Sequence, residues 1–279
     1  MSRVQKYLAH FSCGIPSAVA VKLSFDEFGR DNVRVIYCDT GSEHPDNIRF
    51  REAVENWLGF KTEIVKSSAY KDVDDVIDKT GWISGVHGAR CTGELKKKPA
   101  QDIINFGKQQ EIEILGYTIE EQSRVDNFIK QNNERKIDPI LIRRGLSKID
   151  CQGIIHAAGI ARPAMYDLGY QNNNCLGCVK GQAGYWNKVR IDFPEVFARR
   201  AAQERACKAA ICKVEARAKG NGFDWPEWVY KLSNFEDYTV GKDKSRARLP
   251  VYLDELPEDY GNYPKELEIQ CGVFCMLNK

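Results

Sequence analysis

Short runs of β-branched and aromatic residues alternate with amphipathic stretches through the first half of this chain. The expected elements follow one another as strand 6–11, helix 17–28, strand 33–38, helix 46–58, and strands over 62–66, 111–116 and 137–142. Gly29 and Gly59 directly follow the two helical stretches, as glycine often does at a helix C-terminus. Strands separated by helices are joined by right-handed crossovers, so the pattern predicts an α/β fold with helices on both faces of a parallel sheet. Such sheets bind ligands at the carboxyl ends of their strands.

The pattern changes after about residue 160. Residues 172–175 are typical of a loop, residues 194–219 are expected to form one long helical stretch, and residues 221–232 are rich in Trp and Pro. We therefore divide the chain into an α/β part, residues 1–160, and a helical, irregular, cysteine-containing part, residues 161–279, packed on it as one integrated domain.

Charge and composition narrow the class of protein. The 279 residues include 41 Lys and Arg against 39 Asp and Glu, and this net charge of +2 is too small to argue for a nucleic-acid partner. No apolar run approaches the roughly 20 residues of a membrane span, and the N-terminus lacks the apolar core of a signal peptide. We therefore expect a cytoplasmic enzyme without a membrane partner. In that setting, ten cysteines favour metal or redox chemistry over disulfides.

The first strand is followed by the sequence SCGIPS, residues 12–17, just before a helix. Backbone N–H groups at the start of a helix can hold an anion, and Gly14 permits close approach. The hydroxyls of Ser12 and Ser17 can add hydrogen bonds. The alternative is a tight turn in which Ser17 is only the N-cap of the helix.

A second polar turn follows the second strand. It contains Asp39, Thr40 and Gly41. An acidic residue at the carboxyl end of a strand commonly accepts hydrogen bonds from a ribose or an amino group. The alternative is a turn that serves only to cap the next helix, through Asp46.

The order of these segments resembles the adenine-nucleotide α-hydrolase-like superfamily, which includes PP-loop ATP pyrophosphatases and the sulfonucleotide reductases. The resemblance implies a three-layer sandwich around a mostly parallel twisted sheet, with nucleotide binding by residues 1–160. ATP-cleaving members usually carry an S-G-G-x-D-S loop, whereas this chain has Cys13 at the first glycine position and Pro16 at the aspartate position. The loop is more similar to the S-F-G-I-Q-A loop of the reductases, which do not split ATP. The implied nucleotide-binding residues here are Ser12, Cys13, Gly14, Ser17, Asp39, Thr40 and Gly41.

A second segment supports the same resemblance. Residues 116–124, GYTIEEQSR, are similar to the reductases' G-L-R-R-E-Q-S segment, with one extra residue and without its paired arginines. The similarity adds Gly116, Gln122 and Arg124 to the implied nucleotide-binding residues.

Cys175 and Cys178 place two thiols on one turn, which is the usual way for a chain to offer two ligands to zinc or to an iron–sulfur cluster. Gly177 between them lets the backbone fold sharply. The alternative is packing, because free cysteines are among the most buried residues. We assign to packing the five cysteines at Cys13, Cys38, Cys151, Cys207 and Cys212.

Residues 90–99, RCTGELKKKP, resemble the C-C-x-x-x-K-x-x-P segment of cluster-containing adenosine phosphosulfate reductases. The resemblance implies a [4Fe–4S] cluster held by Cys91, Cys175 and Cys178. Thr92 replaces the second cysteine of that segment, so one iron stays open unless another ligand arrives. An open iron is what cluster-dependent sulfur-transfer enzymes use to hold a sulfide. If a further cysteine completes the set, a four-cysteine zinc site is the alternative.

The C-terminal residues 266–275, ELEIQCGVFC, resemble the E-C-G-L-H tail of the reductases, whose cysteine attacks the sulfate sulfur. Cys271 takes the position of that nucleophile. Cys275 could resolve an adduct at Cys271 as a disulfide, or both could ligate a metal. The resemblance also implies that Lys96 offers its charge to a sulfate or phosphate. Otherwise its lysine run would simply be a solvated helix face.

Three functions follow from these motifs. The leading one is a sulfonucleotide reductase-like enzyme, in which Cys271 attacks an adenosine phosphosulfate, sulfite leaves, and a thioredoxin-like reductant restores the enzyme. The second is a PP-loop sulfurtransferase that thiolates tRNA or DNA with an open-site cluster. The third is a nucleotide-binding protein whose metal is structural. We also expect a homo-oligomer.

Several aromatic and basic segments lie in the second half of the chain. Residues 185–190 and 225–228 carry aromatics, and residues 199–200 and 242–248 carry arginines and lysines. Together they could form a surface for RNA or DNA. The simpler interpretation, which we prefer, is that they are packed aromatics and solvated helix and loop faces.

Overall fold

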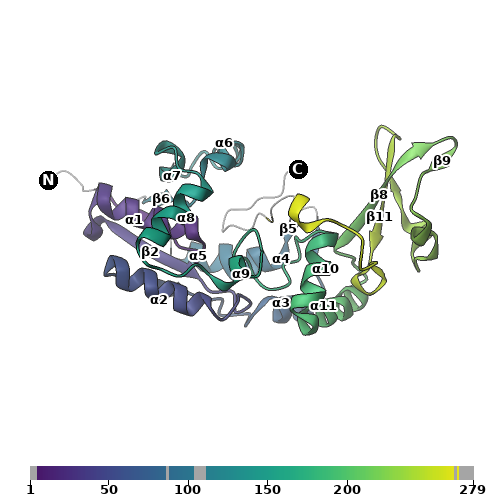
Figure 1. Ribbon diagram of the computed structural model, residues 1–279, viewed down its shortest axis with the longest axis horizontal. Helices are drawn as coiled ribbons and strands as arrows, with labels where there is room; N and C mark the ends of the chain where they lie inside the picture. Colours follow the sequence, from purple (N-terminus) through teal and green to yellow (C-terminus); the bar gives the residue numbers. More distant parts are fainter. Residues whose placement is uncertain (1–4, 86–87, 104–110, 267–268, 270–279) are drawn as a thin grey trace. The chain divides into compact units, whose positions relative to one another are not determined.

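The computed structural model describes residues 5–85, 88–103, 111–266 and 269 (Figure 1). The described residues form two compact units, one within residues 1–73 and 92–175 and the other within residues 74–91 and 176–271.

The first unit contains a five-stranded sheet in which every strand is parallel to its neighbours. The strands are β1 (Tyr7–His10), β2 (Val33–Cys38), β3 (Glu63–Val65), β6 (Ile112–Ile114) and β7 (Ile137–Asp138). Their order in the sheet is β3-β2-β1-β6-β7. After the central strand β1, the chain adds β2 and β3 on one side and then β6 and β7 on the other side. This confirms the predicted α/β fold with a parallel sheet.

Helices cover both faces of this sheet. The helical segments of the unit are α1 (Ile15–Phe28), η1 (Arg30–Asn32), α2 (Asn47–Leu58), η2 (Gly93–Lys97), α5 (Lys98–Ile103), η3 (Ile119–Glu121), α6 (Gln122–Gln131), α7 (Ile140–Arg143), α8 (Lys148–Ala157) and α9 (Ala164–Asp167). Successive strand residues point to opposite faces, and β1 divides its side chains accordingly. Ala9 packs in the core shared with α1, α2 and α8, whereas Leu8 packs in the opposite core with Ala100 of α5.

The strand expected over residues 137–142 is shorter than predicted. Only Ile137–Asp138 pairs with β6, and α7 begins at Ile140. Pro139 lies between them, and proline has no N–H to donate to a sheet. The apolar run that suggested a longer strand instead buries Ile140 and Leu141 in the core beneath α1.

The second unit combines helices with a four-stranded antiparallel sheet. Its elements, wholly or mostly within the unit, are α3 (Val73–Thr80), β4 (Ser84–Gly85), β5 (Gly88–Ala89), α4 (Arg90–Thr92), α10 (Ala183–Asp192), α11 (Pro194–Cys207), β8 (Cys212–Lys219), β9 (Gly222–Phe223), η4 (Glu227–Lys231), η5 (Phe235–Asp237), β10 (Thr239–Val240), β11 (Arg246–Val251), η6 (Leu253–Glu255) and η7 (Tyr263–Lys265). The larger sheet has the order β10-β11-β8-β9. The C-terminal part was expected to be helical and irregular, so this sheet is an addition to the prediction.

The single long helix expected over residues 194–219 is wrong. Helix α11 ends at Cys207, where Lys208 takes a left-handed conformation with φ of 50°, and strand β8 begins at Cys212. The reason lies in the periodicity, since residues 212–219 alternate between buried and exposed positions from Cys212 to Arg217. A period of two is that of a strand with one buried face.

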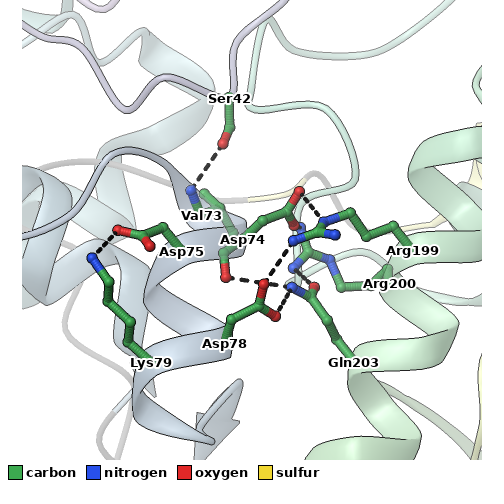
Figure 2. A network of polar contacts seen from close by, with 9 residues as sticks. All are labelled: Ser42, Val73, Asp74, Asp75, Asp78, Lys79, Arg199, Arg200 and Gln203. Atoms are coloured by element: carbon green, nitrogen blue, oxygen red, sulfur yellow. Dashed lines mark hydrogen bonds and ion pairs between the residues drawn. The ribbon is translucent and has the colours of Figure 1, made fainter.

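Charged side chains join α3 to α11 within the second unit (Figure 2). Arg199 forms ion pairs with Asp74 at 2.8 Å and with Asp78 at 2.7 Å. Arg200 lies 3.1 Å from Asp74 and donates to the Gln203 side chain at 2.6 Å. The Arg200 side chain is only 3% exposed, whereas that of Arg199 is 53% exposed, so the two neighbours differ in how strongly water screens them.

Among the described residues, no helix combines the length and the apolar character needed to cross a membrane.

Candidate functional site

The loop between β1 and α1 is closed by its own serines. Gly14 is the N-cap of α1, which begins at Ile15, so Ser17 is the third residue of the helix. The Ser17 hydroxyl donates to the Gly14 carbonyl at 2.8 Å and accepts the Ser12 N–H at 3.1 Å. The alternative in which Ser17 is only the N-cap is therefore wrong. The early N–H groups of a helix have no partner within it, so this loop presents amides where an anion can bind.

Cys13 holds the loop in place rather than offering a reactive thiol. Its backbone has a φ of 57°, which is unusual for a residue other than glycine, and its side chain is fully buried. The Cys13 carbonyl accepts a hydrogen bond at 2.7 Å from Asn173, which also donates to Asn47. Burial raises the pKa of the Cys13 thiol far above its ordinary value, so it stays protonated at neutral pH.

Gly116 brings the end of β6 against the same loop. A Cβ atom at this position would lie 2.7 Å from both the N and Cα atoms of Ser17 and 3.0 Å from the carbonyl carbon of Pro16. These are backbone atoms, so they cannot move aside as a flexible side chain could. The structure therefore brings together Gly116 and the 12–17 loop, which the sequence assigned to one binding site.

The turn after β2 is fixed by its own hydrogen bonds. Asp39 accepts the Gly41 N–H at 2.9 Å through one carboxylate oxygen, and the other oxygen lies 2.7 Å from the Lys66 ammonium. Gly41 has a φ of 67°, and a Cβ there would lie 2.5 Å from the Lys71 carbonyl oxygen. Only glycine fits this position without strain. Asp39 is thus held in one orientation at the carboxyl end of β2.

Asp46 occupies the N-cap position of α2, but its carboxylate does not cap the helix. It accepts hydrogen bonds from the Arg49 guanidinium and, at 2.8 Å, from the Ala164 N–H. Asp46 thus connects α2 to the start of α9. The helix-capping alternative is correct in that Asp46 lies at the N-cap position, but its side chain makes no capping hydrogen bond.

Lys96 lies in the η2 turn, which has π-helical geometry, beside the end of β2. Its carbonyl accepts a hydrogen bond from the Cys38 thiol at 3.8 Å. Burial raises the pKa of Cys38 to about 11, although the Lys96 charge opposes that rise. The next lysine but one, Lys98, instead pairs with Glu94 at 2.6 Å. Lys96 and Lys98 therefore lie in different surroundings, and Lys96 is the one next to the carboxyl end of β2.

The two α6 residues implied by the resemblance make contacts within their own segment. The exposed Gln122 side chain donates to Asp126 at 2.8 Å. The Arg124 guanidinium pairs with Glu121 at 2.7 Å and lies over the Tyr117 ring, 4.6 Å from its centroid. These two contacts fix the Arg124 guanidinium against residues 117–121, which directly follow Gly116.

The predicted thiol ligands Cys175 and Cys178 lie on a turn at Gly177, which has a φ of 61°. Cys175 Sγ lies 3.0 Å from Thr40 Oγ1, and the Cys178 N–H donates to the Tyr185 hydroxyl at 2.9 Å. Two buried thiols three residues apart fit a pair of metal ligands. Within the part of the chain that the structure describes, no three His, Cys, Asp or Glu side chains are grouped as a metal site.

The phosphoadenosine phosphosulfate reductase domain model matches residues 6–181. The chain belongs to this family. A comparison with curated proteins gives no match. The family binds a nucleotide of the phosphoadenosine phosphosulfate type and takes part in sulfur metabolism.

The residues matched to the phosphoadenosine phosphosulfate reductase family include every predicted nucleotide-binding and metal-binding residue of this chain, as well as Lys96. Cys271 and Cys275 come after the matched region, and both lie outside the described residues.

The sequence analysis missed a buried polar cluster at the end of β1, next to the 12–17 loop. His10, the last residue of β1, has Nε2 2.8 Å from a carboxylate oxygen of Glu113, which also pairs with Arg135. Burial alone would raise the pKa of Glu113, but its hydrogen bonds to His10 and Arg135 hold it below its usual value. The available signal was a glutamate inside a strand predicted to be buried, since a buried charge requires a partner.

Proposed function

We propose that this chain binds an adenosine phosphosulfate and releases sulfite from it. The observation that carries the proposal is that the ends of β1, β2 and β6 bring the 12–17 loop, the turn at Asp39 and Gly116 to one edge of a parallel sheet. Ligands of such sheets bind at this edge. The match to the reductase family supports the substrate class.

In this proposal the 12–17 loop binds the phosphates, through the N–H groups at the start of α1 and the Ser12 hydroxyl. The adenosine lies near Asp39, whose carboxylate accepts hydrogen bonds from hydroxyl or amino groups. Lys96, beside the end of β2, supplies a positive charge to the sulfate. Cys13 and Pro16 replace residues of the ATP-cleaving loop, which favours a sulfonucleotide over ATP.

The proposed chemistry is a displacement at sulfur. The Cys271 thiolate attacks the sulfate sulfur, and the bond between sulfur and the phosphate oxygen breaks, so the adenosine phosphate leaves with that electron pair. The product is an S-sulfonate on Cys271. Attack by a second thiol, from Cys275 or a thioredoxin-like dithiol, releases sulfite and forms a disulfide. The dithiol reductant then restores both thiols, so each sulfite formed consumes two electrons.

Cys91, Cys175 and Cys178 are the proposed ligands of a metal group, a [4Fe–4S] cluster in the first instance and zinc as the alternative. The support is the buried thiol pair on the turn at Gly177, together with the match to the family. When bound, a cluster held by three cysteines would supply an iron with an open position, whereas zinc would stabilise the turn. No step above passes through it.

The experiment that tests the function is a calorimetric titration of anaerobically purified protein with adenosine phosphosulfate, phosphoadenosine phosphosulfate and ATP. We expect a sulfonucleotide to bind at least about tenfold more tightly than ATP, which corresponds to about 1.4 kcal/mol. Preference for ATP would contradict the proposal and favour the sulfurtransferase alternative.

The Cys271→Ser variant then tests the chemistry. It should keep nucleotide affinity within about twofold, because binding rests on the first unit, and it should release no sulfite in a coupled assay with a dithiol. Sulfite release at the wild-type rate would rule out Cys271 as the nucleophile.

A further inference from the structure

The antiparallel sheet of the second unit has one buried face and one exposed face. Along β8 the side chains of Cys212, Val214 and Ala216 are buried, and along β11 those of Ala247, Leu249 and Val251 are buried. The alternate residues are exposed, and on these two strands they are almost all charged. They are Lys213, Glu215, Arg217 and Lys219 on β8, and Arg246 and Arg248 on β11.

Positive charge is concentrated on this part of the chain. Residues 212–219 and 239–251 contain seven Lys and Arg against two Asp and Glu, a net charge of +5, whereas the whole chain carries +2. The rest of the protein is therefore net negative. The weak overall charge conceals a strongly basic segment.

Only two of these seven cations are neutralised by ion pairs. Arg248 pairs with Glu215 across the strands at 2.6 Å, and Lys219 pairs with Asp224 at 3.0 Å. No described carboxylate lies within 4 Å of the charged group of any of the other five. These five, which we call the basic surface, are Lys213, Arg217, Arg246 and the two lysines of the turn between β10 and β11, Lys242 and Lys244.

Two members of the basic surface repel each other directly. The register of the sheet places Arg217 of β8 opposite Arg246 of β11. Like charges at directly opposite positions destabilise an antiparallel pair. Asp243 compensates in part, since Arg246 helps to lower its pKa, but its carboxylate accepts the Ser245 N–H in the turn. A bound polyanion would remove the repulsion.

We propose that the basic surface binds the phosphate backbone of double-helical RNA. The outward positions of β8 and β11 carry no aromatic residue, so this face offers no stacking platform for the bases of a single strand. The sheet that carries these residues has four strands, so it is wider than the α-helix or two-stranded ribbon that the major groove of DNA admits. Double-helical RNA instead presents a wide, shallow minor groove edged by phosphates, which suits a flat array of long cationic side chains. The proposal is independent of the sulfonucleotide reaction, because it rests only on the second unit.

The test uses the full chain and a fluorescein-labelled RNA hairpin, with binding followed by fluorescence anisotropy at several salt concentrations. The probe variant is Arg217→Gln with Arg246→Gln. We expect it to weaken binding at least about tenfold and to make the dependence of log K on log salt shallower by about two, or ~1 for each lost phosphate contact. The same variant should resist urea better than the wild type, because the repulsion between the two strands is gone.

The matched control is Glu215→Gln with Arg248→Gln, which changes the same face and the same two strands but removes a neutralised pair. Its RNA affinity should stay within about twofold of the wild-type value.

Three results would overturn the proposal. One is absence of RNA binding by the wild type at low salt, and another is equal loss in both double variants. The third is binding of a DNA duplex or of polyglutamate as tightly as the RNA hairpin, because the surface would then be a general anion exchanger or an acidic-protein site. Failure of the sulfonucleotide titration would leave all three results unaffected.

Discussion

Gly116 must be glycine because neighbouring backbone atoms leave no room for a Cβ, and not because its own φ angle requires glycine. The nearest atoms to its missing Cβ are the backbone N and Cα of Ser17, at 2.7 Å. Ser17 in turn closes the loop through Ser12 and Gly14. A substitution at Gly116 therefore acts directly on the proposed phosphate site.

We expect Gly116→Ala to push the start of α1 away from β6. Overpacking of this kind costs about 1–3 kcal/mol of stability, and displacement of binding groups by about 1 Å should lower sulfonucleotide affinity at least about tenfold. Calorimetry and urea unfolding measure the two effects.

The control for Gly116 is Gly153→Ala in α8, where a Cβ would meet nothing within 4 Å. Alanine is a better helix former than glycine, so this variant should gain up to about 1 kcal/mol of stability and keep its affinity. Equal loss of affinity in both variants would show that the contact between Gly116 and Ser17 does not matter for binding.

Individual site residues could be predicted only where a local motif carried them. The 12–17 loop and the turn at Gly41 follow strands and contain glycines, so their place at the sheet edge was visible in the sequence. The partnership of His10 with Glu113 was not, because 103 residues separate them and only the pairing of β1 with β6 brings them together.

At the scale of elements, α3 and α11 are joined by two adjacent arginines in different environments. Arg200 is buried and contacts Asp74 and Gln203, whereas Arg199 is exposed and contacts Asp74 and Asp78. Removing Arg200 leaves the buried Gln203 side-chain oxygen without its donor, whereas an exposed ion pair is screened by water.

We therefore expect Arg200→Met to lower the free energy of unfolding by about 1–3 kcal/mol. Arg199→Met should cost less than about 1 kcal/mol, although it removes two short ion pairs. Urea unfolding of both variants compares them directly. A larger loss for Arg199→Met would mean that burial does not decide the strength of this contact.

Element types were predictable where the periodicity was clear, as in the alternating strands and helices of the first unit. Strand β8 was missed because its residues were joined to the preceding helix, although the alternation of Cys212, Lys213, Val214 and Glu215 has the period of a strand. The small and charged residues there also occur in helices, so composition alone could not separate the two.

At the scale of the whole molecule, the metal group proposed for Cys91, Cys175 and Cys178 can be tested by measuring the metal content of the protein. We expect anaerobically purified protein to contain iron and acid-labile sulfide, roughly four of each per chain for a [4Fe–4S] cluster. Cys175→Ser and Cys178→Ser should each lose most of both.

The control for the metal is Cys207→Ser at the half-buried end of α11, which should retain the wild-type content of iron and sulfide. Zinc at about one equivalent without sulfide would favour the zinc alternative. Metal retained by both ligand variants would exclude these thiols as ligands.

The second unit takes α3, β4, β5 and α4 from the middle of the chain and the rest of its elements from after residue 175. A fragment that ends at residue 175 would thus keep every described segment of the first unit, but would leave Asp74 and Asp78 without Arg199. Such a fragment would present an orphaned acidic helix and aggregate or be degraded more readily than its length suggests. Because the second unit is built from two separated stretches of the chain, no single cut can detach it intact.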